Sequence, residues 1–355
     1  MTARARILAA ARTLALPAAT VALSGAAGWA YAAVFATGLH LVSTVYGVFF
    51  GVPLILYERG KLWPRLRARV RRASTPVFAA ATLAIVVCTF VAGIALAGLV
   101  LWATGIMRTP LLDAAPTPLR LAYAFAAAAL IVAVFRVRDL IGPRIFLSFL
   151  VGRYHRPIHE ERVFLFLDLV GSTSFAERHG DLRAAEYLAR AFEVLAGPVA
   201  RYRGSVDDFV GDMALVTWRL DEGVRDAAVV RCVFAFLEEI ERGAEGWHRR
   251  FGEVPRFRAA LHCGQVVTAE IGVDHHKIAY FGDVVNTTAR LEALAKVLGE
   301  PIVASSDLLK RIGFLPQEIA YVELGRQIVR GRDQPLDVTG LKRLGYRSGA
   351  AIPPR

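Results

Sequence analysis

Two patterns of apolar residues divide the chain. Residues 7–57, 76–104 and 119–135 are long runs rich in Ala, Leu and Val, whereas the residues after Pro157 alternate between apolar and polar side chains. A transmembrane helix needs about 20 apolar residues, while alternation is typical of half-buried strands and amphipathic helices. The pattern therefore predicts an all-α transmembrane bundle followed by a soluble domain.

About four transmembrane helices fit the first half. We place them at residues 13–35, 39–57, 77–102 and 121–135. A cleavable signal peptide is the weaker interpretation of the first run, because the run is longer than a signal-peptide core and leads directly into another span. The four spans contain no Asp or Glu, so nothing in them marks an ion or proton pathway.

The charge divides at the same place. The formal net charge is +12; up to Pro157 there are 17 Lys and Arg against three Asp and Glu, and beyond it 26 against 28. Seven of the basic residues lie in the connection 58–74, which the positive-inside rule places in the cytoplasm. We therefore expect a multi-pass protein of the inner (plasma) membrane whose soluble half is cytoplasmic. We expect the lipid bilayer, and no nucleic acid, as the partner of the basic half.

A short segment connects the two halves. Residues 139–160 carry apolar side chains at a spacing that predicts a cytoplasmic amphipathic helix after Pro143, with a solvated tether as the simpler interpretation. The predicted organisation is a membrane domain over 1–138, this linker over 139–160, a catalytic domain over 161–342 and a tail over 343–355. The three scattered cysteines favour a reducing compartment over a disulfide framework.

The soluble half opens on an apolar strand that ends in a charge. Residues 163–169 read VFLFLDL, and Asp168 is followed, after Leu169 and Val170, by Gly171, Ser172 and Thr173. A capping box of Ser174 with Glu177 predicts that a helix starts there. Backbone N–H groups at such a strand-to-helix junction suit a phosphate. The carboxylate of Asp168 would repel that phosphate unless a cation lay between them.

A second carboxylate is expected to converge on the same cation. Residues 204–218 read as two short strands with Asp212 at the turn between them, although Gly-Asp in a hairpin is by itself usually only a turn. Two carboxylates with bridged phosphate oxygens indicate magnesium or manganese. Further along, Asn286 and Arg290 lie four residues apart on one helix face, where an amide and a guanidinium would stabilise charge on phosphorus, or would simply be solvated.

Three stretches in this order and spacing, FLDLVGSTS, GSVDDFVGD and YFGDVVNTTARLE, resemble the catalytic domain of the class III nucleotidyl cyclases. The likeness covers roughly residues 160–342, and the membrane half and linker resemble the four-span bacterial membrane cyclases. The resemblance implies an α+β domain with a ferredoxin-like core that acts as a head-to-tail homodimer. The implied reaction converts a nucleoside triphosphate, most often ATP, to its 3′,5′-cyclic monophosphate and pyrophosphate.

The resemblance also implies roles for individual residues. It assigns two divalent metal ions, Mg or Mn, to Asp168 and Asp212 of one protomer. It assigns orientation of the ribose to Asn286 and stabilisation of the transition state to Arg290, both from the partner protomer. Arg330 falls where the family has a basic residue against the terminal phosphates.

Two positions depart from the family pattern. The purine-specifying lysine would stand at Asp208, and its usual partner, an aspartate or threonine, would stand at Ala279. An ionised Asp208 accepts hydrogen bonds from adenine or cytosine as well as from guanine, so the base stays open and ATP is expected from the family alone. The direction in which Asp208 points depends on whether its hairpin is bulged.

Three functions compete. We expect an enzyme, a membrane-anchored adenylate cyclase, over a receptor-like protein whose cyclase domain binds nucleotide without turnover. The retained Asp168, Asp212, Asn286 and Arg290 favour the enzyme, because domains that lose activity typically lose one of them. A purely structural membrane scaffold would have no use for these aligned polar motifs.

Overall fold

The computed structural model describes residues 3–35, 37–71, 73–108, 117–141, 146, 152–154, 156–272, 277–327 and 335–344. The chain divides into two compact units, Met1–Ile141 and Gly142–Arg355. The finer predicted boundaries at 138, 160 and 342 stay predictions. Most of the predicted linker helix, and most of the tail, lie outside the described residues.

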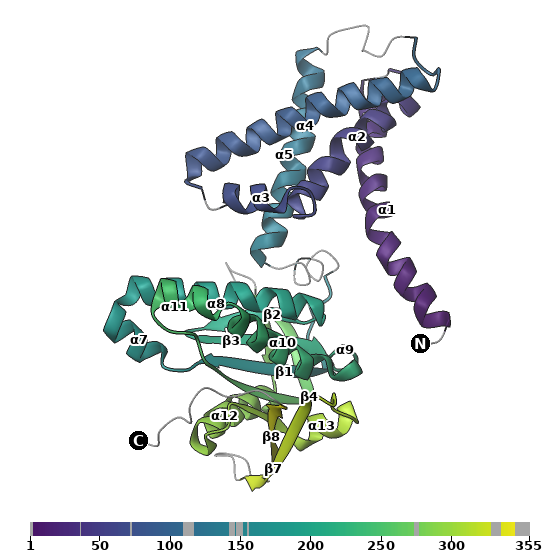
Figure 1. Ribbon diagram of the computed structural model, residues 1–355. Helices are drawn as coiled ribbons and strands as arrows, with labels where there is room; N and C mark the ends of the chain where they lie inside the picture. The colour runs from purple at the N-terminus through teal and green to yellow at the C-terminus, as the bar shows by residue number, and fades with distance from the viewer. Residues whose placement is uncertain are drawn as a thin grey trace. The chain divides into compact units, whose positions relative to one another are not determined.

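The first unit is helical (Figure 1). Its elements are α1 (Ala3–Val34), α2 (His40–Glu58), α3 (Pro64–Arg71), α4 (Thr75–Ala103) and α5 (Pro118–Ile141). Among the described residues, three helices are long and apolar enough to cross a membrane: α2, α4 and the segment Pro118–Arg138 of α5. The fourth long helix, α1, covers the first predicted span. The basic connection contains the short helix α3, which carries four arginines.

Close backbone approach holds α1 and α2 together. A Cβ atom added at Gly28 of α1 would lie 2.1 Å from the carbonyl oxygen of Ser43 in α2. Small residues at a helix interface allow this approach, which is the usual way in which membrane helices pack. A small apolar core of Leu54, Val86 and Ala128 joins α2, α4 and α5. Many other apolar side chains, such as Leu83 and Leu130, are exposed, as expected for helices that face lipid.

The second unit is an α+β domain (Figure 1). Its strands are β1 (Ile158–Leu169), β2 (Ser205–Val210), β3 (Met213–Arg219), β4 (Phe257–Ile271), β5 (Lys277–Phe281), β6 (Ile302–Ser305), β7 (Ile319–Gln327) and β8 (Leu336–Arg343). Its helices are α7 (Ser172–His179), α8 (Asp181–Arg201), α9 (Leu220–Val224), the 3₁₀ turn η1 (Arg225–Ala227), α10 (Ala228–Arg242), α11 (Ala244–Phe251), α12 (Asp283–Leu298) and α13 (Ser306–Ile312).

The sheet has the order β2-β3-β1-β4-β6-β8-β7, and β5 pairs with β4. Strand β1 is antiparallel to both β3 and β4, so the first four strands have the order β4-β1-β3-β2 with helices after β1 and β3. This arrangement confirms the predicted ferredoxin-like βαββαβ core. Residues 257–271 form one long strand, β4.

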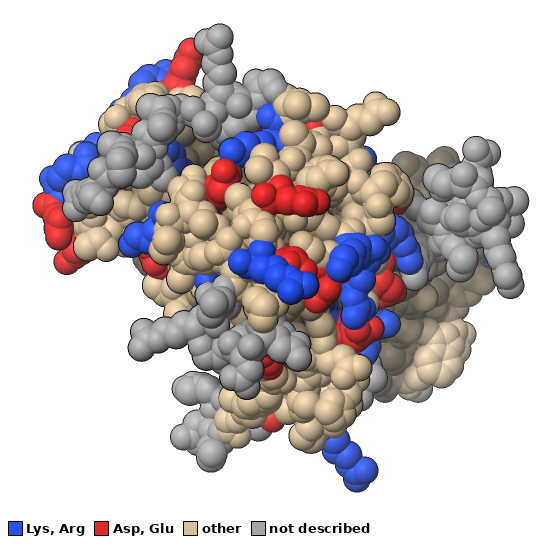
Figure 2. Space-filling model, turned by 90° about the horizontal axis from the view of Figure 1, so that it is seen from below, with Lys and Arg blue, Asp and Glu red and all other residues tan. Residues whose placement is uncertain are grey.

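Alternation along β1 separates the two faces of the sheet. Val163, Leu165 and Leu167 enter the larger core, which includes residues of α8 and α10. Phe164 and Phe166 point to the opposite face, where they meet Val284 of α12. Asp168 follows Phe166 by two residues in the strand, so its side chain lies on the same face as Phe164 and Phe166, the face that α12 covers. Basic and acidic side chains are interspersed on the surface that Figure 2 shows.

Candidate active site

The two predicted metal-binding aspartates lie at the ends of adjacent strands. Asp168 pairs with Met213 in the β1–β3 register, which makes Asp212 the last residue of the turn before β3. The backbone N–H of Leu169 donates to the carbonyl of Asp212 at 3.3 Å. The turn requires a positive φ of 62° at Gly211, which glycine adopts without steric cost. Residues 44 positions apart thus meet because the β2–β3 hairpin folds back beside β1.

Asp168 is held by an arginine that the motif search did not find. Arg258, its cross-strand partner in β4, donates to its carboxylate at 2.8 Å and contacts Glu292 of α12 at 3.3 Å. Burial, together with the charges of Glu292 and Asp212, raises the pKa of Asp168 to about 6, and Arg258 offsets part of this rise. Asp168 and Glu292 therefore share one guanidinium, and the charge of Asp212 acts on Asp168 as well, an excess of negative charge that a divalent cation would neutralise.

The residues present fit the divalent ions that the family implies. Hard oxygen ligands are the preferred ligands of Mg and Mn, and a magnesium ion uses one or two carboxylates together with substrate phosphates. Among the described residues, no cluster of three or more His, Cys, Asp or Glu side chains is arranged to hold a metal by itself. The geometry thus suits ions held jointly by the two aspartates and a bound triphosphate.

The junction after β1 differs slightly from its prediction. Helix α7 starts at Ser172 with Gly171 as its N-cap, so the predicted capping box, with Ser174 as the N-cap and Glu177, is wrong by three residues. The reason is that Gly171 adopts a φ of 79°, which turns the chain into the helix earlier. The hydroxyl of Ser172 donates to the carboxylate of Asp212. Gly171 and Thr173 are exposed beside it.

Asn286 and Arg290 lie on α12, as predicted, but on a side of the helix away from this junction. Glu292 of the same helix faces Arg258, and Arg290 lies about 200° around the helix from it at 3.6 residues per turn. Asn286 is exposed and Arg290 is partly exposed. One protomer therefore does not direct these two side chains to Asp168. Arg330 lies outside the described residues.

The two predicted base-pocket positions lie near a bulge in β2. Val206 pairs with Val216 and Asp208 with Leu215, so Asp207 is the extra residue. Asp208 accepts from the ammonium of Lys277 in β5 at 2.5 Å. Ala279 lies two residues further along β5, on the same side of that strand as Lys277. Lys277 was not singled out by the sequence analysis, although its distance of two residues from Ala279 is a signal for it.

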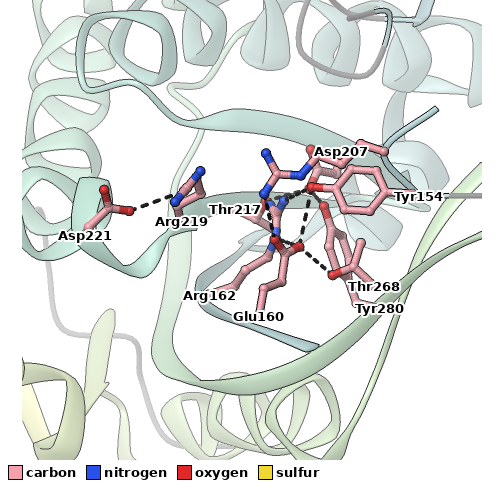
Figure 3. A network of polar contacts seen from close by, with 10 residues as sticks. Tyr154, Glu160, Arg162, Asp207, Thr217, Arg219, Asp221, Thr268 and Tyr280 are labelled. Atoms are coloured by element: carbon pink, nitrogen blue, oxygen red, sulfur yellow. Dashed lines mark hydrogen bonds and ion pairs between the residues drawn. The ribbon is translucent and has the colours of Figure 1, made fainter. Parts of the chain in front are cut away.

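A buried polar network lies next to this bulge (Figure 3). Arg162 of β1 is its centre, and it contacts Glu160, Thr217 and Tyr154. Arg162 was not predicted from the sequence. Arg162 stands at an alternate position of β1 with Phe164, Phe166 and Asp168. This spacing is the signal that places it on the active-site face.

Comparison with known proteins identifies the family. Residues 155–339, more than half of the chain, match the family described as the adenylate and guanylate cyclase catalytic domain. The chain belongs to this family. It is 49% identical over 315 residues to adenylate cyclase 2 of Rhizobium meliloti (strain 1021), an alignment that covers 88% of this chain and 86% of that protein.

More distant similarity agrees with the fold. An uncharacterised protein of Mycobacterium tuberculosis is 31% identical over 222 residues, which cover 58% of this chain and 36% of the longer mycobacterial protein. The solved structure of a bacterial light-regulated adenylyl cyclase superposes with a TM-score of 0.54 at 16% identity, covering 66% of this chain and 68% of that one. This likeness supports the fold of the second unit.

Proposed function

We propose that the chain is a membrane-anchored adenylate cyclase that converts ATP to 3′,5′-cyclic AMP and pyrophosphate. The observation that carries the proposal is the convergence of Asp168 and Asp212 at adjacent strand ends, beside the start of α7, in a chain 49% identical to an adenylate cyclase. When bound there, two divalent ions would activate the 3′-hydroxyl and neutralise the triphosphate.

The residues of this chain would perform the remaining tasks. The Ser172 hydroxyl orients the carboxylate of Asp212, and Arg258 orients that of Asp168. The exposed turn at Gly171 and the first N–H groups of α7, at Ser172 and Thr173, are available to phosphate oxygens, because the first turn of a helix has no internal partners for them. Arg330 is proposed to contact the terminal phosphates, as the family resemblance implies.

We further propose that the active site lies between two copies of the chain. Asn286 and Arg290 lie on the side of α12 away from Glu292 and its contact with Arg258, so in this proposal they serve the site of a second protomer. In a two-fold symmetric dimer each copy would receive the pair from its partner, so two equivalent sites form. Asn286 would orient the ribose, and Arg290 would stabilise charge that develops on the α-phosphate.

The base would be read by Asp208 and Lys277, with Ala279 beside them. Asp208 is a hydrogen-bond acceptor and Lys277 a donor, so the pair matches the amino group and N1 of adenine. The same pair matches N1–H and O6 of guanine, which makes GTP the second candidate substrate. The identity to adenylate cyclase 2 favours ATP.

The membrane arrangement completes the proposal. The basic helix α3 is proposed to lie at the cytoplasmic surface, which puts the catalytic unit in the cytoplasm. The side of the membrane on which the catalytic unit lies is checked by protease digestion of inverted and of right-side-out inner-membrane vesicles. Digestion of the catalytic unit in right-side-out vesicles would contradict this topology.

The activity is tested with the purified full-length protein. Each of the four nucleoside triphosphates is supplied with Mn²⁺, and cyclic product and pyrophosphate are measured. Cyclic AMP as the main product is expected. Nucleotide binding without any cyclic product would instead identify a catalytically silent receptor, and cyclic GMP as the main product would move the assignment to GTP.

A further inference from the structure

Arg162 of β1 is a buried arginine at the centre of a polar network. The Arg162 side chain is only 10% exposed, and its guanidinium donates to Glu160 at 2.6 Å, to Thr217 at 2.8 Å and to Tyr154 at 3.0 Å. It also lies over the ring of Tyr280, 4.9 Å from the centroid. An arginine that is buried with its donors satisfied is a rigid support, because breaking any one contact would leave a polar group without water or partner.

The network continues to the bulge of β2. The Thr217 hydroxyl, which accepts from Arg162, donates to the carboxylate of Asp207 at 2.6 Å. The phenol of Tyr280 in β5 donates to the same carboxylate oxygen at 2.5 Å. Figure 3 shows these side chains together, with Asp207 beside Thr217 and Tyr280. Asp207, the extra residue of the bulge, is thus held by hydroxyl groups from two other strands.

The bulge decides which way Asp208 points. In the structure Asp208 pairs with Leu215, which belongs to the face that contains Phe164 and Tyr280. In a regular strand Asp207 would take that place, and Asp208 would instead pair with Ala214, which belongs to the larger core on the opposite face. A register shift of one residue reverses the face of every following side chain. The contacts of Asp207 therefore keep Asp208 beside Lys277.

We propose that Thr217 and Tyr280 are positioning residues for base recognition, because they hold Asp207 in the bulge and so aim the Asp208–Lys277 pair at the nucleotide base. The inference rests on the proposed function, in which Asp208 and Lys277 read the base. Arg162 supports the arrangement by holding the Thr217 hydroxyl. None of these three residues touches the nucleotide in this scheme.

A matched pair of substitutions tests Thr217. Thr217→Val keeps the shape and removes the hydroxyl, whereas Thr217→Ser keeps the hydroxyl. In the full-length protein, Thr217→Val is expected to change the ratio of kcat/KM values for ATP and GTP roughly tenfold, since the partly buried carboxylate of Asp207 loses a donor. Thr217→Ser is expected to keep the ratio within about twofold, because its hydroxyl still reaches Asp207.

Tyr280→Phe provides a second test that removes one oxygen and preserves the ring packing against Phe164. A change in the ATP-to-GTP ratio in the direction produced by Asp208→Ala is expected, with kcat at saturating ATP largely retained. The same ratio is measured for Tyr321→Phe, a matched control at an exposed tyrosine of β7. If Tyr280 acts through Asp208, Tyr280→Phe should change nothing further in the Asp208→Ala background.

The outcomes separate the two proposals. Absence of cyclic product from the unaltered protein would overturn the proposed function. If the unaltered protein is active, and Thr217→Val and Tyr280→Phe keep its ratio of kcat/KM values for ATP and GTP, the positioning role alone is overturned. A uniform loss of kcat for both bases in these variants would also overturn it, because it would indicate a general structural role.

Discussion

The two units bury polar groups in different ways. Among the described residues, the membrane unit buries the polar side chains of Thr20, Ser24, Ser43 and Glu58 and exposes many apolar ones, and a close backbone approach between Gly28 and Ser43 joins α1 and α2. In the catalytic unit the buried guanidinium of Arg162 lies in a network of hydrogen bonds with Glu160, Thr217 and Tyr154. The comparison teaches that shape complementarity is the main requirement in the membrane unit, whereas matched charges and hydrogen bonds are essential in the catalytic unit.

The largest effect is expected from the loss of either carboxylate that is proposed to bind metal. Asp168→Ala or Asp212→Ala should lower kcat on the order of 10³-fold or more, because one carboxylate cannot hold the ions that stabilise several kcal/mol of developing charge. Steady-state rates with Mn²⁺ and ATP provide the measurement, and a gel-filtration profile checks that the proposed dimer persists. Asp221→Ala, at an exposed aspartate, is the control; near-normal turnover in the Asp168 variant would reject the metal assignment.

Mixing two inactive proteins tests whether the site is shared. Asp168→Ala and Arg290→Ala damage different halves of the proposed site, so a mixed dimer keeps one intact site of two. Random exchange of subunits should restore roughly a quarter of the normal activity, because half of the dimers are mixed. Activity is measured against mixing ratio, with mixed dimers shown by two affinity tags. Mixed dimers that stay inactive would argue for a site within one chain.

The next largest effect is expected on the stability of the catalytic unit when its buried ion pair is broken. Arg162→Met removes the charge at the centre of the network and leaves Glu160 without its nearest cationic partner. The loss should be about 3–5 kcal/mol in the free energy of unfolding, the range for a broken buried ion pair. The matched control is Arg190→Met, whose ion pair with Glu193 is exposed and should contribute less than about 1 kcal/mol. Thermal unfolding of both variants is compared; equal midpoints would show that the network contributes no special stability.

The smallest effect on chemistry is expected in the membrane unit. Gly28→Val places a side chain against the Ser43 backbone, so α1 and α2 must separate, at a cost of about 1–3 kcal/mol for an overpacked contact. The heat-stability of the detergent-solubilised protein should fall, while the ATP-to-GTP ratio stays unchanged. Ala26→Val, at an exposed position of the same helix, is the control. A changed ratio in Gly28→Val would show that the membrane unit acts on base recognition.

Particular residues show how far the sequence could predict the site. Asp168 and Asp212 were found because each interrupts a local apolar pattern at a strand end, and the structure places them on neighbouring strands. Arg258 and Lys277 were missed, since each is one charged residue among many until the strand pairing brings it to Asp168 or Asp208. The start of α7 was misplaced because the turn at Gly171 competed with a plausible capping box.

The division into a membrane half and an α+β half follows from the sequence by itself, because hydropathy and its period are properties of neighbouring residues. The sequence by itself also determines which residue types stand at the strand ends and that Asn286 and Arg290 share one helix face. Only the tertiary structure decided that Asp207 forms a bulge and that Asp208 meets Lys277. The physical reason is that the register depends on hydrogen bonds from other strands, here from Thr217 in the second strand of the same hairpin and from Tyr280 in the distant strand β5. A shift of one residue would have turned Asp208 to the opposite face.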